Sequence, residues 1–98
     1  MPVIMTTLAT LNPHGAAALE SYAAIVVPLI HAAGGEVLSR SIFREGLVGD
    51  SFPQFIAAIR FPDADRAREM IRSEAYRRAV VYRNDAFLDV RTFIGDPV

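Results

Sequence analysis

The chain has 98 residues, of which 52% are hydrophobic, a formal net charge of −1 and no cysteine. This length predicts one domain, residues 1–98. The absence of cysteine excludes disulfides, a thiolate metal site and a cysteine nucleophile, and the slightly negative charge argues against nucleic acid as the main partner.

The basic residues are all arginine, which we interpret as the codon bias of a GC-rich, hence bacterial, genome. The N-terminus lacks the basic segment of a signal peptide. The longest uncharged run, between Glu20 and Glu36, is too short for a membrane span and contains Pro28 and His31. We therefore expect a cytoplasmic protein without a membrane partner.

The first half of the chain predicts a strand followed by a helix. Residues 3–11 are uncharged and rich in β-branched side chains, which is typical of a strand. Residues 12–15 (NPHG) form a turn, and apolar side chains recur at helical spacing over residues 16–33. Gly34 and Gly35 end this helix as a C-cap.

The middle of the chain predicts two strands. Residues 36–48 form a long irregular strand, with Gly46 as a bulge or a break into a hairpin, and residues 49–53 form a loop. Phe55–Phe61 is apolar at nearly every position, as in a strand covered on both faces, and Pro62 stops it.

The last third predicts a divided helix and a final strand. Asp63 is the expected N-cap, because its carboxylate can accept the amide hydrogens of the first turn. The apolar stripe breaks at Ser73–Glu74, so a second helical piece is expected over residues 75–83. A turn at Asn84–Asp85 then leads to a strand over residues 86–94.

The order β-α-β-β-α-β predicts an α+β fold of the ferredoxin-like, split βαβ type. Right-handed crossovers place both helices on one face of a four-stranded antiparallel sheet.

Several short pieces, in this order and spacing, resemble one family. They are Glu20-x-Tyr22, Val27-Pro28, Gly34-Gly35 with Arg40, Gly49-Asp50, Ile59-Arg60-Phe61-Pro62-Asp63, Ser73-Glu74-Ala75-Tyr76 and Tyr82-Arg83. Together they resemble the family of domain of unknown function 1330 (DUF1330), in the dimeric α+β-barrel superfamily. The resemblance implies the fold, a homodimer and a pocket, but no reaction. Arg60 stands where the family usually has an acid, so no role tied to that acid is transferred.

Four side chains are candidates for ligand binding, because they are the polar or amphipathic groups expected to border the helix–sheet core: Tyr22, His31, Tyr76 and Arg83. His31 is open to two interpretations, a general base or ligand, or a histidine favoured by the negative end of the helix dipole. Arg83 is equally open, since it could instead cap its helix. His14 is expected in an exposed turn, and no metal site is expected.

The second face of the sheet is expected to be covered by another copy of the chain. On the last strand, mostly aliphatic residues alternate with a second set that carries the aromatic and charged side chains, and Arg60, Asp89 and Arg91 are expected inside the barrel or at its seam. Asp89 is there either paired in a small network or in a wet cavity that accepts an anion. Phe87 and Phe93 are expected to be buried at this seam, because a charge-poor sheet face is too apolar to leave in water.

Two functions fit these features. The first is a cofactor-independent enzyme or small-molecule binder with its pocket between helices and sheet. The alternative is a non-catalytic dimeric binding or structural module. No metal, flavin or haem is expected, since no glycine-rich phosphate loop opens a helix and the two histidines are far apart in sequence.

Overall fold

The computed structural model describes residues 1–98 as four strands and four helices. The strands are β1 (Val3–Leu11), β2 (Glu36–Ile42), β3 (Phe55–Phe61) and β4 (Phe87–Gly95). The helices are α1 (Ala16–Ala32), α2 (Ala64–Arg72), α3 (Glu74–Arg77) and α4 (Val80–Ala86).

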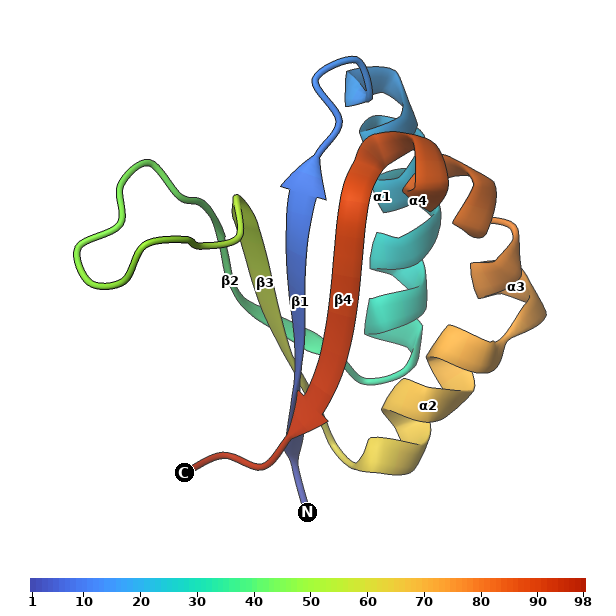
Figure 1. Ribbon diagram of the computed structural model, residues 1–98. Helices are drawn as coiled ribbons and strands as arrows, with labels where there is room; N and C mark the ends of the chain where they lie inside the picture. Colours follow the sequence, from blue (N-terminus) through green and yellow to red (C-terminus); the bar gives the residue numbers. More distant parts are fainter.

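The strands form one antiparallel sheet in the order β2-β3-β1-β4. All four helices lie on one face of this sheet (Figure 1), which confirms the ferredoxin-like α+β fold. We call the opposite side the outer face. No helix covers it, and no helix of the chain is long and apolar enough to cross a membrane.

The helix ends follow from local chemistry as expected. The backbone of Gly34 has φ 79°, a conformation that glycine adopts at little cost, and its N–H donates to the carbonyl of His31. The carboxylate of Asp63 accepts from the backbone N–H of Arg66 at 2.8 Å. Ser73 divides α2 from α3, because its hydroxyl accepts from the backbone N–H of Tyr76 at 3.1 Å.

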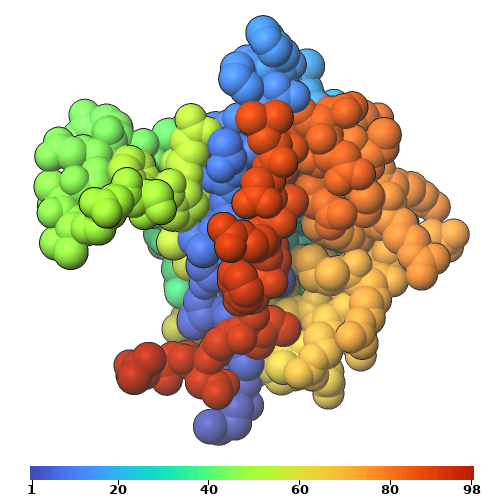
Figure 2. All heavy atoms as spheres, viewed as in Figure 1, coloured from blue at the N-terminus to red at the C-terminus, as the bar shows by residue number.

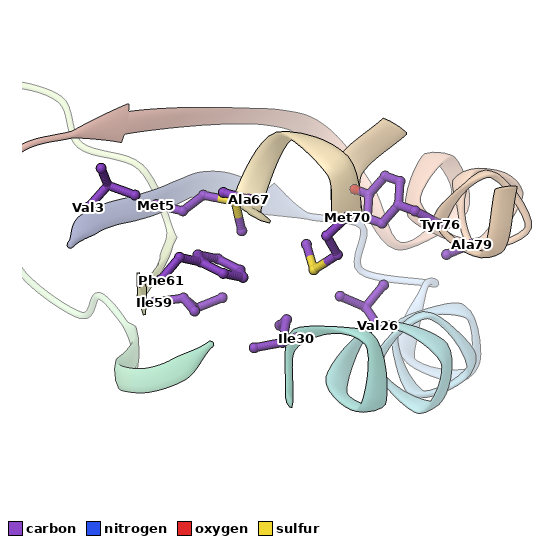
Figure 3. Packing of buried hydrophobic residues seen from close by; sticks show 10 residues of the cluster. All are labelled: Val3, Met5, Val26, Ile30, Ile59, Phe61, Ala67, Met70, Tyr76 and Ala79. Carbon is purple, nitrogen blue, oxygen red and sulfur yellow. The ribbon is translucent and has the colours of Figure 1, made fainter. Parts of the chain in front are cut away.

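The main core lies between the sheet and the helices (Figure 3). Phe61 on β3 is fully buried, and Met5 on β1 and Met70 on α2 belong to the same cluster. Val26 and Ile30 of α1 close the same cluster. Every second residue of β1 and β3 faces the helices, and residues at helical spacing on α1 face the sheet. The contact between these two apolar surfaces holds the two layers together.

Two predicted boundaries are wrong. The second strand ends at Ile42, and residues 43–54 form a loop that extends away from the sheet on its uncovered side (Figures 1 and 2). Its base is closed by Phe43 and Phe52, whose rings meet edge to face at 6.2 Å. The turn expected at Asn84–Asp85 lies inside α4 instead, and the chain passes from that helix directly into β4.

A β-bulge decides which side of β4 faces the helices. The pairing shifts so that Leu11 opposes Phe87 while Thr10 opposes Asp89, which leaves Leu88 without a partner. Phe87 is therefore buried under the helices, and its predicted place at the outer seam is wrong. Phe93 does lie on the outer face, where it is 53% exposed.

Candidate functional site

A cavity of about 120 Å³ lies between α1 and the helix-facing side of the sheet. We call it the helix–sheet cavity. Fifteen of its 18 lining residues are hydrophobic, and the exceptions are Thr7, Arg40 and Thr92. Because its wall is mostly apolar with a few polar groups, it has the composition of a small-molecule site.

Two tyrosines form one wall of the cavity. Tyr22 comes from α1 and Tyr76 from α3, and their hydroxyl oxygens are 2.9 Å apart. The two rings meet edge to face, with centroids 6.2 Å apart, and Tyr76 lies beside Met70 (Figure 3). The Ser73 cap sets the start of α3 and thereby the position of Tyr76.

Arg83 of α4 stands behind Tyr76. Its Nη1 lies 3.4 Å from the Tyr76 hydroxyl oxygen, and its guanidinium carbon lies 5.9 Å from the centre of the Tyr76 ring. Its Nε is buried and has no hydrogen-bond partner. Since a guanidinium can only donate, Tyr76 accepts from Arg83 and can donate its own hydrogen to Tyr22. The hydroxyl hydrogen of Tyr22 is then available to a further acceptor.

The electrostatics of the site keep Tyr22 protonated. Burial is the main cause that raises the pKa of the Tyr22 phenol far above its ordinary value, and the charge and hydrogen bond of Tyr76 add to it. The positive charge of Arg83 acts in the opposite direction but does not offset the burial. Tyr22 is therefore a hydrogen-bond donor at neutral pH.

A second polar pair lies on the sheet side of the cavity. Thr7 on β1 and Thr92 on β4 face each other across the strand pair, and their hydroxyl oxygens are 2.9 Å apart. Sequence reasoning missed this pair. The alternation of β1 places Thr7 on the same side as Met5 and Ala9, but the register that brings Thr92 opposite it is not legible in one strand alone.

The structure brings together three of the four predicted ligand-binding residues. Tyr22 and Tyr76 line the cavity, and Arg83 contacts Tyr76. His31 does not line it: one position after the buried Ile30, it is turned outward and exposed in the last turn of α1. His14 is exposed in the β1–α1 turn, as expected.

The three charged residues expected inside the barrel or at its seam lie on the outer face, which is the side where that seam is predicted. Arg60 pairs with Glu36 at 2.6 Å, and Arg91 lies 3.5 Å from Asp89. Asp89 and Arg91 line a second hollow of about 210 Å³ together with Phe52 of the 43–54 loop. No three metal-ligating side chains come together anywhere in the chain.

The family model described as Domain of unknown function (DUF1330) matches residues 7–94. The chain belongs to this family. No curated protein matches it.

Solved structures similar to the chain share its fold. Two of them are crystal structures of the RPA0582 protein, which is described as a protein of unknown function from Rhodopseudomonas palustris. The structure of the methylated protein is 28% identical to this chain, and the other structure is 29% identical. Their TM-scores are 0.87 and 0.84, and the match covers 99% of this chain and 81% and 82% of theirs.

More distant structures are described as dimeric proteins of unknown function with a ferredoxin-like fold. One from Thermobifida fusca is 15% identical with a TM-score of 0.61, and covers 99% of this chain and 92% of its own. One from Bacteroides fragilis is 9% identical with a TM-score of 0.63, and covers 98% and 96%. These likenesses extend the fold assignment.

Proposed function

We propose that the protein binds a small molecule with an apolar body and one oxygen-bearing group in the helix–sheet cavity. The observation that supports this most directly is the chain of hydrogen bonds from Arg83 through Tyr76 to Tyr22. Such a chain ends on a donor at the wall of an apolar cavity, and a ligand oxygen is the acceptor that completes it.

The size of the cavity limits the ligand. An engineered apolar protein cavity of about 150 Å³ takes up benzene. A cavity of about 120 Å³ therefore suits one small ring or a short branched chain, or one end of a longer molecule that leaves through the opening. Larger planar cofactors do not fit inside it.

The same geometry suits simple chemistry without a cofactor. A phenol that stays protonated can hold a carbonyl oxygen and polarise it, and Arg83 behind the tyrosine pair favours negative charge that develops there. In the non-catalytic alternative, the same contacts only bind. A Tyr22→Phe variant separates the two, because it weakens binding in both cases but lowers turnover only in the first.

We also propose that the protein works as a homodimer joined through its outer faces. Apolar side chains gather on this face, which the chain's own helices leave uncovered: Ile4, Leu8, Ile56, Ala58 and Phe93. Two solved structures of this fold are described as dimeric. Ala58→Glu places a charge at the middle of this surface, and sedimentation equilibrium is expected to show monomer or unfolded chain. A stable folded monomer of the unmodified protein at micromolar concentration contradicts the proposal.

Methionine methyl NMR tests the ligand site. The chain has three methionines; Met5 and Met70 line the cavity, and Met1 is fully exposed. Titration with benzyl alcohol is expected to shift the Met5 and Met70 signals with saturation and to leave Met1 unchanged. The Met1 signal thus serves as an internal control in every spectrum.

A matched pair of variants locates the binding. Ala23→Leu adds three carbons to the cavity wall and is expected to abolish the shifts, while Ala24→Leu changes the exposed neighbour on the same helix and leaves them. Equal binding to both variants, or shifts of Met1 alone, places the alcohol outside the cavity and overturns the proposal.

A further inference from the structure

The charges around the helix–sheet cavity are of one sign. Arg40 is the charged residue that lines it, and no aspartate or glutamate does. At the tyrosine wall, Arg83 contributes a second positive charge through its contact with Tyr76. A ligand in this cavity therefore meets arginine without any compensating carboxylate from the protein.

Neither arginine is neutralised elsewhere. The ion pairs of the chain join Arg60 to Glu36, Arg68 to Asp65 and Arg91 to Asp89. Arg83 is partly buried, and its Nε lacks any acceptor. A partly buried guanidinium without a carboxylate partner is costly, so an anion bound at the tyrosine pair in front of it stabilises the folded protein as well as the complex.

The two arginines lie on different sides of the cavity. Arg40 belongs to the edge strand β2, where it is exposed at the rim. The tyrosine wall lies toward the opposite edge, because Tyr22 packs edge to face on Phe87 of β4 with centroids 5.8 Å apart. An anion can thus be attracted at the rim and held at the inner wall.

We propose that the ligand is an apolar monocarboxylate whose carboxylate accepts from Tyr22, with Arg83 behind the tyrosine pair and Arg40 at the rim. This rests on the proposed function and names the class of its ligand. Charge-assisted hydrogen bonds are roughly twice as strong as neutral ones, so the anion is preferred over an uncharged molecule of the same shape.

Benzoate and benzamide test this class, since they differ in charge and hardly in shape. We expect benzoate to bind about tenfold more tightly than benzamide at pH 7, measured from the Met5 and Met70 methyl shifts. Raising the salt concentration is expected to weaken the binding of benzoate but not that of benzamide. The loss should match the share of the benzoate affinity that the exposed Arg40 contributes.

Variants assign the preference to the arginine. Arg83→Gln is expected to reduce the benzoate preference to about twofold, and Arg83→Lys to retain most of it, since a charged donor adds roughly that difference. Arg77→Gln, at an exposed position of α3, makes the same change of net charge and is expected to leave the preference intact.

The outcomes separate the two proposals. If benzamide binds unmodified protein as tightly as benzoate, the anionic class is wrong while the ligand site stands. If neither of these molecules nor benzyl alcohol shifts Met5 and Met70, both proposals fail. These comparisons need only the unmodified protein, so they decide the question even where an Arg83 variant does not fold.

Discussion

The hydroxyl pair of Tyr22 and Tyr76 makes a prediction about stability that the structure quantifies. Tyr76→Phe removes an oxygen that holds Tyr22 at 2.9 Å and Arg83 at 3.4 Å. The rings keep their edge-to-face contact, so the loss is confined to the hydrogen bonds. Leaving part-buried donors without a partner costs about 1–3 kcal/mol, and Tyr22→Phe, which breaks one bond, costs about 1 kcal/mol.

The double variant is expected to be less destabilised than the sum of the single ones. The Tyr22–Tyr76 bond is lost in either variant and cannot be lost twice, so the coupling is about 1 kcal/mol. Urea unfolding followed by circular dichroism, at one fixed protein concentration, measures all four proteins, and Tyr82→Phe at an exposed position is the control. Additivity within about 0.3 kcal/mol refutes the hydrogen-bonded pair.

Three further changes test the electrostatics and the helix ends. Burial raises the pKa of Tyr22 above 10.0 in the folded protein. The contribution of this residue to the free energy of unfolding is therefore fully present below about pH 10 and is lost as the pH rises further. Unmodified protein should lose about 1.4 kcal/mol more than Tyr22→Phe between pH 9 and 11 in urea unfolding; parallel curves contradict this. Asp63→Ala should cost about 1 kcal/mol while Asp63→Asn keeps the cap, and equal losses argue against capping. Gly34→Ala should lower the free energy of unfolding by about 1–2 kcal/mol, because φ is positive at this position. Gly95→Ala, with open space around it, should leave the free energy unchanged. An unchanged free energy for Gly34→Ala would contradict this reasoning.

The fold was predictable because its signals are local. The strand Val3–Leu11, the buried strand Phe55–Phe61, the caps at Gly34 and Asp63 and the helix break at Ser73 depend on alternation and on side chains a few residues apart. The end of β2 could not be predicted, because residues 43–48 keep a strand-like composition although β3, the partner strand, offers no residues to pair with them. Strand length there is decided by pairing, which one segment does not contain.

The position of Phe87 shows most clearly what could not be predicted from the sequence. Strict alternation predicts that Phe87 points to the other face of the sheet from Val90 and Thr92. The unpaired Leu88 shifts the register by one residue, so Phe87 points to the same face as they do. A one-residue shift moves a side chain to the other face, and nothing near Leu88 in the sequence marks the bulge.

The candidate site was predictable in part. Tyr22 and Tyr76 lie on the apolar faces of their helices, and this placement is readable from helical spacing. Arg83 was predicted as one of the polar groups that border the helix–sheet core, whereas its contact with Tyr76 depends on how α4 packs against α3. His31 was misplaced into the cavity because one residue of helix rotates a side chain by about 100°, from core to solvent.

A crystal structure of the protein grown with benzyl alcohol tests the central proposal most directly. We expect the ring inside the helix–sheet cavity, between Met5 and Met70, with the alcohol oxygen within hydrogen-bonding distance of the Tyr22 hydroxyl. An empty or collapsed cavity, with the alcohol bound only on the surface, would contradict it.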